Sequence, residues 1–177
     1  MDNVKPIASF CVDHRKIKPG MYLSRVDGDI VTFDLRTRTP NSGDYMDNTT
    51  MHSMEHLFAT YVRNSSIGDQ VIYFGPMGCQ TGFYLVLRDP DFATVLEIVR
   101  SVLRQIIAHD GPMFGASAVE CGNYRSLNTE AAQLECERYL AVLSSQKDGE
   151  FSYELERKYS FGSGSSKRYY IDAIIRP

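Results

Sequence analysis

The first regular pattern along the chain is a pair of short neighbouring segments, the second of which alternates polar and apolar residues. Residues 20–25 and 30–37 lie on either side of Asp27-Gly28, a dipeptide typical of tight β-turns. Side chains that alternate in this way point to opposite faces of a strand. The pattern therefore predicts a β-hairpin near the beginning of the chain.

A second pair of strand-like segments lies in the middle of the chain. Residues 71–74 and 81–88 are rich in strand-forming side chains, and a glycine-rich segment, residues 75–79, separates them. Gly and Pro interrupt regular structure, so the sequence predicts two strands with a bend between them. Cys79 lies at this bend.

Three segments show the apolar periodicity of helices. One of residues 48–50 can cap a helix that runs to about residue 64, and Asp91 can cap a second helix. A third helix is expected from near Asn128 to about Ser145. Its predicted core stripe follows the i, i+3, i+4, i+7 spacing: Cys136, Tyr139, Leu140 and Leu143.

The order of these elements predicts an α+β fold. The chain gives a hairpin, a helix, two strands, a second helix, a further strand and the third helix, without regular βαβ alternation, so we expect a mostly antiparallel sheet with helices packed on one face. We expect a single domain over residues 1–147 and a C-terminal extension of unknown role over residues 148–177. In that extension, residues 161–166 have a linker composition and residues 169–175 form a possible edge strand.

Composition narrows the class of protein. With 177 residues, 43% of them hydrophobic, the chain can bury one sizeable core. A net charge of −3 without a dense basic run disfavours nucleic-acid binding. We expect no membrane segment and no signal peptide, and hence a cytoplasmic protein with free thiols. These thiols are Cys11, Cys79, Cys121 and Cys136.

The most informative motif is H-x-x-E-H at residues 52–56. On a helix His52 and His56 project from one face one turn apart, with Glu55 on nearly the same side. This arrangement offers two nitrogen ligands to a divalent metal and a carboxylate beside its open position. The plain alternative is a capped helix with two surface histidines.

A catalytic metal site of this kind needs a third protein ligand. Cys79 and Cys121 are both candidates, and spacing alone does not rank them. Two other hypotheses stay open: an inverted-motif zinc peptidase, which needs a different third ligand, and a closed structural or regulatory metal module with Cys79 or another residue as a fourth ligand. The chain has no P-loop, no G-x-G-x-x-G motif and no C-x-x-C pair, so nucleotide binding and zinc deaminase chemistry are disfavoured.

Five further sequence segments are informative when they are considered together. They are residues 8–14 (ASFCVDH), 33–41 with FDLR and PN, 52–57 (HSMEHL), 75–84 (GPMGCQTGFY) and 120–123 (ECGN). In this order they resemble the S-ribosylhomocysteine lyase (LuxS) family over about residues 7–145. Departures are Ser53 in place of a threonine, and Tyr73 and Gly75 in place of an aspartate and a serine. The resemblance implies a LuxS/processing-peptidase-like metallohydrolase fold.

The resemblance also implies a function and roles for individual residues. The family cleaves the thioether of S-ribosyl-L-homocysteine to L-homocysteine and 4,5-dihydroxypentane-2,3-dione, the autoinducer-2 precursor, by carbonyl migration and β-elimination. It implies a homodimer with active sites at the interface, and one divalent metal per chain, typically Fe(II), with Zn(II) or Co(II) as substitutes. The implied metal ligands are His52, His56 and Cys121, the acid/base pair is Cys79 and Glu55, and the substrate-binding residues are Ser9, His14 and Arg36.

Overall fold

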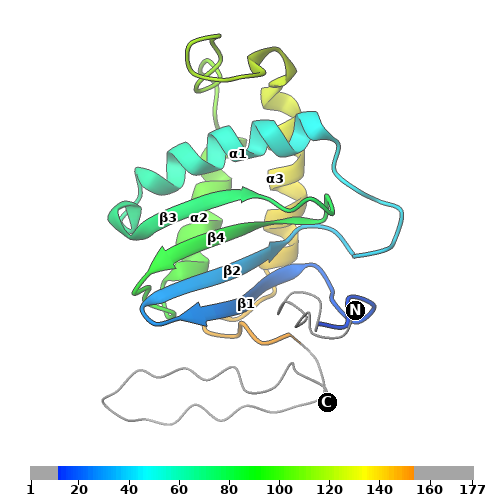
Figure 1. The fold of residues 1–177 in the computed structure, drawn as a ribbon, viewed down its shortest axis with the longest axis vertical. Helices are drawn as coiled ribbons and strands as arrows, with labels where there is room; N and C mark the ends of the chain where they lie inside the picture. The colour runs from blue at the N-terminus through cyan, green and yellow to red at the C-terminus, as the bar shows by residue number, and fades with distance from the viewer. Residues whose placement is uncertain (1–11, 154–177) are drawn as a thin grey trace, which may run out of the picture.

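A four-stranded antiparallel sheet forms one layer of the protein. The computed structural model describes residues 12–153, and all structural statements below concern these residues. The strands follow one another across the sheet in the order β1-β2-β4-β3 (Figure 1). Their bounds are β1 Gly20–Asp27, β2 Ile30–Arg36, β3 Val71–Pro76 and β4 Gly82–Arg88.

The predicted hairpin and the central strand pair are both confirmed. Asp27 pairs with Ile30 across the first turn, and Gly28 there has a φ of 66°, a conformation that glycine adopts without strain. β3 and β4 pair with each other, and the Cys79 bend connects them. The Asp27-Gly28 signal and the strand-like segments on either side of it thus identified the hairpin.

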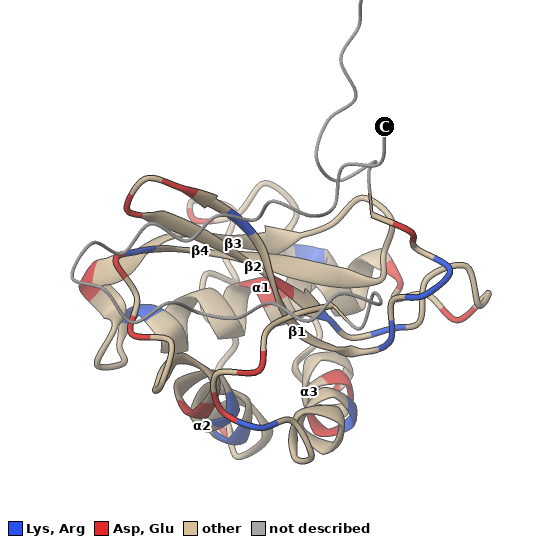
Figure 2. Cartoon of the chain, turned by 90° about the horizontal axis from the view of Figure 1, so that it is seen from below, with Lys and Arg blue, Asp and Glu red and all other residues tan. Residues whose placement is uncertain are grey.

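Three helices pack on one face of the sheet, as expected. They are α1 (Asn48–Arg63), α2 (Val95–Ile107) and α3 (Thr129–Leu143). Figure 1 shows α1 above the β3 edge, and Figure 2 shows α2 and α3 side by side against the sheet. The structure is therefore an α+β fold with an antiparallel sheet. Within residues 12–153, no helix has the length and apolar character needed to cross a membrane.

Two expected helix starts were wrong. The N-cap of α1 is Asp47, whose side chain accepts a hydrogen bond from the Thr50 backbone at 2.7 Å. α2 begins only at Val95, because the Asp91 side chain instead accepts hydrogen bonds within the preceding turn, from Ala93 and Thr94. Short polar side chains compete with the helix for backbone donors, which makes the first turn difficult to place from sequence.

The further strand expected between α2 and α3 is absent from the described residues. This segment contains turns and the short 3₁₀ helix η3 (Tyr124–Ser126); another, η2 (Gly68–Gln70), precedes β3. Gly115 has a φ of 66°, which breaks an extended conformation. Neither edge of the sheet receives the segment, which lies against α1 instead (Figure 1).

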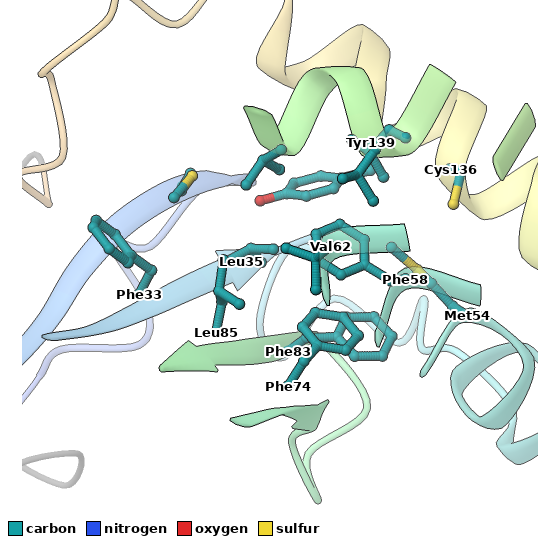
Figure 3. Packing of buried hydrophobic residues seen from close by; sticks show 14 of the residues in the cluster. Phe33, Leu35, Met54, Phe58, Val62, Phe74, Phe83, Leu85, Cys136 and Tyr139 are labelled. Atoms are coloured by element: carbon teal, nitrogen blue, oxygen red, sulfur yellow. The ribbon is translucent and has the colours of Figure 1, made fainter. Parts of the chain in front are cut away.

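An aromatic stack joins α1 to the sheet. The ring of Phe58 on α1 lies 4.2 Å from that of Phe74 on β3, which lies 5.1 Å from that of Phe83 on β4 (Figure 3). All three side chains are buried. Cys136 is also fully buried in this core, as expected from the α3 stripe, and its burial raises the pKa of its thiol.

Charged residues of both signs are interspersed over the surface of α2, α3 and the loops (Figure 2). Glu97 pairs with both Arg100 and Arg104 on α2. Arg38, which follows β2, pairs with the buried carboxylate of Glu135 on α3. This last pair fixes α3 to the end of the sheet near the candidate site.

The chain stays packed after α3. The Gln146 side chain bonds both the N–H and the carbonyl of Met21 on β1, and Leu23 donates to the Phe151 carbonyl at 2.7 Å. Phe151 is buried against Phe33. The division of the chain at residue 147 stays a prediction; in the described part of the predicted extension, residues 148–153, Phe151 and Tyr153 contact the sheet. Residues 161–166 and 169–175 lie outside the described residues.

We expect Phe151→Ala to lower the free energy of unfolding by about 3 kcal/mol, because it leaves a cavity in the core. Urea unfolding at equilibrium measures the change. Val119, which is 96% exposed, provides the control: Val119→Ala should alter stability by less than about 0.5 kcal/mol. Equal stability of the Phe151→Ala variant and the unmodified protein would contradict the assignment of Phe151 to the core.

Candidate active site

One face of α1 carries the three residues of the H-x-x-E-H motif, as the sequence predicted. The His52 and His56 rings lie 4.7 Å apart between centroids and are nearly perpendicular. The opposite side of the helix is buried through residues that include Met54, Leu57 and Phe58. The amphipathic pattern of α1 therefore turns its histidines toward the segment between α2 and α3.

The structure brings a cysteine to the two histidines. Ligand atoms of His52, His56 and Cys121 all lie within 4.8 Å of one another, and they form the only group of at least three such side chains found within residues 12–153. The Cys121 Sγ atom is 3.3 Å from His52 Nε2. Metal–ligand bonds of about 2.0–2.3 Å place donors of one ion roughly 3.5 Å apart, so the group fits a divalent metal after a small closure. We call these three residues the metal group.

Hydrogen bonds to the outer ring nitrogens orient both imidazoles. His56 Nδ1 donates to the Phe114 carbonyl at 2.8 Å. His52 Nδ1 lies 2.8 Å from Ser126 Oγ, and Ser126 donates its own proton to the Asn123 carbonyl, so the histidine is the donor in the first bond. Both Nε2 atoms are then left with lone pairs, which is the tautomer that metal ligands need.

The surroundings of His52 also favour its neutral form. Burial and the neighbouring His56 lower the pKa of His52, which Glu55 raises to a smaller extent. The backbone N–H of Asn123 donates to Cys121 Sγ at 3.3 Å. A hydrogen bond of this kind stabilises negative charge on sulfur. Two neutral imidazoles and a thiolate would leave a bound divalent ion with a net charge near +1.

Glycine allows the segment after α2 to contact the metal group closely. A Cβ atom on Gly115 would lie 3.0 Å from His56 Nδ1, a contact so tight that the imidazole would have to shift by a few tenths of an ångström. Phe114 is held from behind by Tyr61 and His109, whose ring centroids are 5.5 and 5.0 Å from its own. The small residues around 114–118 thus place the carbonyl that orients His56.

Glu55 lies beside the metal group, at a surface depression of about 280 Å³. Glu55 is not a member of the metal group, and its side chain is partly buried on the same helix face as the histidines. A carboxylate at the rim of a depression can reach a bound small molecule. The residues lining the depression are Glu55, His56, Ala59, Thr60, Phe114 and Gly115.

A second polar group lies on the face of the sheet opposite the helices. Arg36 Nη2 forms a buried ion pair with Asp34 Oδ2 at 2.6 Å, and its Nη1 contacts Thr81 Oγ1 at 2.5 Å and Cys79 Sγ at 3.7 Å. Cys79 itself is exposed and lies 3.0 Å from Thr81. Burial raises the pKa of Asp34, and His14 is close enough to oppose part of that rise. We call Asp34, Arg36, Cys79 and His14 the sheet group.

Both groups lie at one end of the molecule. The carbonyl of Gln80, next to Cys79, accepts a hydrogen bond from Met46, which immediately precedes the N-cap of α1. The carbonyl of Thr81 accepts two more from Thr37 and Arg38 at the end of β2. Figure 1 shows the β3–β4 bend beneath the beginning of α1. His52 is the fifth residue of this helix.

The structure therefore arranges the sequence-predicted site residues in two neighbouring sets. His52, His56 and Cys121 come together, with Glu55 beside them. Arg36 and Cys79 form the other set, with His14 nearby, and Ser9 lies outside the described residues.

Several supporting residues were not found from the sequence. Ser126 and the Phe114 carbonyl orient the histidines, and Thr81 contacts Cys79. The sequence indicated this part of the site only through the run of small residues near Gly115. A backbone carbonyl that accepts a hydrogen bond cannot be recognised from the residue type. The unusual residues Tyr73 and Gly75 depend on each other sterically, because the Tyr73 side chain occupies the space that a Cβ on Gly75 would need.

Comparison with known proteins agrees with this geometry. A family model described as S-ribosylhomocysteinase (LuxS) matches residues 7–150. The chain belongs to the S-ribosylhomocysteinase (LuxS) family. Proteins named S-ribosylhomocysteine lyase from Borreliella burgdorferi (strain ZS7) and Desulfotalea psychrophila are 37% and 40% identical to it. Each alignment covers 85% of this chain and 99% of the relative.

A third LuxS family relative leads to the same assignment. The protein named S-ribosylhomocysteine lyase from Finegoldia magna is 40% identical over 83% of this chain and 97% of its own length. Both groups of site residues in residues 12–153 lie inside the segment that the LuxS model matches. Tyr153, which contacts the sheet group, lies beyond it.

We expect Gly115→Ala to weaken metal binding by about 10- to 100-fold, because the added methyl group pushes against His56 and disturbs its bond to Phe114. Competition with a chromogenic chelator measures the affinity. Gly149→Ala is the matched control, since Gly149 also has a positive φ, of 78°, but a Cβ there meets nothing within 4 Å. Equal metal affinities in the two variants would contradict the role given to Gly115.

Proposed function

We propose that the protein is a metal-dependent S-ribosylhomocysteine lyase that produces L-homocysteine and 4,5-dihydroxypentane-2,3-dione. The observation that carries the proposal is the convergence of His52, His56 and Cys121 beside Glu55 in a chain of the LuxS family. Three protein ligands are typical of catalytic sites, which keep one coordination position for substrate. The proposed classification of the domain is the LuxS/processing-peptidase-like fold.

The metal proposed for this site is Fe(II), with Zn(II) or Co(II) as substitutes. Two imidazoles and one thiolate suit these borderline ions better than Mg²⁺ or Ca²⁺, which prefer oxygen ligands. When bound, the ion supplies Lewis-acid stabilisation of negative charge on a sugar oxygen. The hydrogen bonds that the two Nδ1 atoms donate to Ser126 and to the Phe114 carbonyl orient the rings, so that both Nε2 atoms would be free to hold the ion.

Glu55 and Cys79 are proposed to move the protons. Moving the sugar carbonyl along the chain requires a base to remove a proton from one carbon and an acid to return one to the next. Once the carbonyl group has reached the position at which sulfur is on its β carbon, a base removes the proton from the α carbon between them. Homocysteine thiolate then leaves by β-elimination. Glu55 approaches from α1 and Cys79 from the β3–β4 bend, so they can serve different positions of one substrate.

The sheet group is proposed to bind the polar ends of the substrate. Arg36 Nε and Asp34 Oδ1 are both buried without a hydrogen-bond partner among the described residues. A guanidinium with an unused donor can bind the homocysteine carboxylate. Ser9 and His14 complete this proposed subsite, and Cys79 lies at its margin.

We further propose that the enzyme is a cytoplasmic homodimer whose active sites contain residues of both chains. The family resemblance supports this arrangement. Two separate polar groups at one end of each chain also fit a site that a second copy completes.

The proposed function is tested by incubating anaerobically purified, Fe(II)-loaded protein with S-ribosylhomocysteine and measuring thiol release with Ellman's reagent. The chelated apoprotein is the control. We expect release that depends on the metal. A folded, metal-loaded protein that releases no thiol would overturn the proposal.

Cys79→Ala and Glu55→Gln should each lower kcat by more than about 100-fold while leaving the metal content unchanged, because each removes a proton carrier and neither removes a ligand. Initial rates and metal analysis on the same preparations measure both quantities. Glu130→Gln, at an exposed position on α3, is the matched control and should keep full activity. A Cys79→Ala or Glu55→Gln variant that works at the unmodified rate would disprove the role of that residue.

Cys121→Ser distinguishes this function from the two other metal hypotheses. We expect the variant to lose the metal, because the hydroxyl group is a poor replacement for a thiolate. Full retention of the metal would favour a peptidase-like set of ligands. Loss of the metal from Cys79→Ala would instead indicate a closed structural site; the observed contacts of Cys79, with Arg36 and Thr81, argue against it.

A further inference from the structure

The C-terminal segment after α3 crosses from one face of the sheet to the other. Phe151 lies in the core on the helix face, packed against Phe33 and Phe92. Two residues later, Tyr153 stacks on Tyr22 of β1, with ring centroids 4.6 Å apart and an angle of 17° between the rings. The backbone of Phe151 is bonded to Leu23 on β1, so the crossing point is fixed.

On the far face, Tyr153 reaches the sheet group. Its hydroxyl donates a hydrogen bond to Asp34 Oδ2 at 2.9 Å. The same carboxylate oxygen accepts from Arg36 Nη2, and Arg36 Nη1 contacts Cys79 Sγ. A continuous set of contacts therefore leads from the C-terminal segment to the proposed proton carrier.

We propose that Tyr153 is a positioning residue of the active site, which holds the Asp34–Arg36 ion pair in the orientation that directs the guanidinium group toward Cys79 and the substrate. This inference rests on the proposed function. Tyr153 lies three residues beyond the end of the family match.

Asp34 is the group through which Tyr153 acts. The carboxylate is buried, and its pKa is raised by burial, while Arg36, Tyr153 and His14 oppose that rise in this order. Removing the hydroxyl therefore raises the pKa of Asp34 further, so the ion pair with Arg36 is lost at a higher pH as the solution is acidified. The titratable groups that interact with Asp34 are Arg36 on β2, Tyr153, His14, Tyr84 on β4 and Tyr139 on α3.

Tyr153→Phe tests the inference because it keeps the ring stacked on Tyr22 and removes only the donor. We expect KM for S-ribosylhomocysteine to rise about five- to tenfold with kcat within about twofold, as suits a lost hydrogen bond that orients a binding group. We also expect the acid limb of kcat/KM to move to higher pH. Aliquots withdrawn at each pH and adjusted to pH 8 before Ellman's reagent is added keep the thiol assay uniform.

Tyr22→Phe is the matched control. It removes the hydroxyl of the other ring in the same stack, which bonds to the Lys18 carbonyl rather than to Asp34. We expect both KM and the pH profile to stay unchanged. Thermal unfolding of all three proteins shows whether they are equally folded.

A measurement independent of turnover separates this inference from the proposed function. The ¹³C chemical shift of the Asp34 carboxyl group in the Zn(II)-loaded protein reports its protonation directly. A higher pKa in Tyr153→Phe than in Tyr22→Phe supports the inference even if the unmodified protein releases no thiol, a result that would overturn only the lyase function. Identical Asp34 titrations in the two variants would overturn it, as would identical KM values in an active enzyme.

Discussion

The stacked rings of Phe58, Phe74 and Phe83 determine the position of α1 on the sheet, and the rest of the site depends on that position. They connect α1 to the two strands that border the Cys79 bend, and the position of α1 decides where His52 and His56 meet Cys121. Stacked aromatic pairs each add about 0.5–1.5 kcal/mol beyond the area they bury, and their geometry is directional. A helix held in this way can neither rotate nor slide without separating rings, so the core sets the metal ligands in place.

The two layers of the protein carry different parts of the chemistry. The helical layer and the segment between α2 and α3 provide the metal group and the depression beside Glu55. The sheet provides a buried ion pair and an exposed thiol. The hydrogen bond between Met46 and Gln80 ties the layers together at the place where both groups lie. A change in the helical layer can thus alter metal affinity without directly altering the Asp34–Arg36 ion pair or the Cys79 thiol of the sheet.

The sequence revealed those features that leave a periodic or local trace. The hairpin, the central strands and the three helices follow from alternation and helical spacing, and His52 and His56 were placed on one face by their separation of four residues. The choice between Cys79 and Cys121 could not be made from spacing, because it depends on how a loop folds back onto α1. The strand expected before α3 did not form, and two backbone groups of the loop are instead bonded to α1: the Phe114 carbonyl to His56 and the Asn128 N–H to Ser53. Such an arrangement has no local signature. The starts of α1 and α2 were missed because an aspartate can cap a helix or stabilise a turn. Asp47 caps α1, whereas Asp91 accepts hydrogen bonds in the turn before α2.

The attachment of the C-terminal segment to β1 also affects how the protein behaves at high concentration. β1 is an edge strand, and a bare edge offers its peptide groups to any other extended chain. Here the Gln146 side chain bonds Met21 in the manner of a peptide unit, and the Phe151 carbonyl occupies the N–H of Leu23. This segment therefore protects part of the edge: it occupies the N–H and carbonyl of Met21 and the N–H of Leu23, which are then not available for edge-to-edge aggregation.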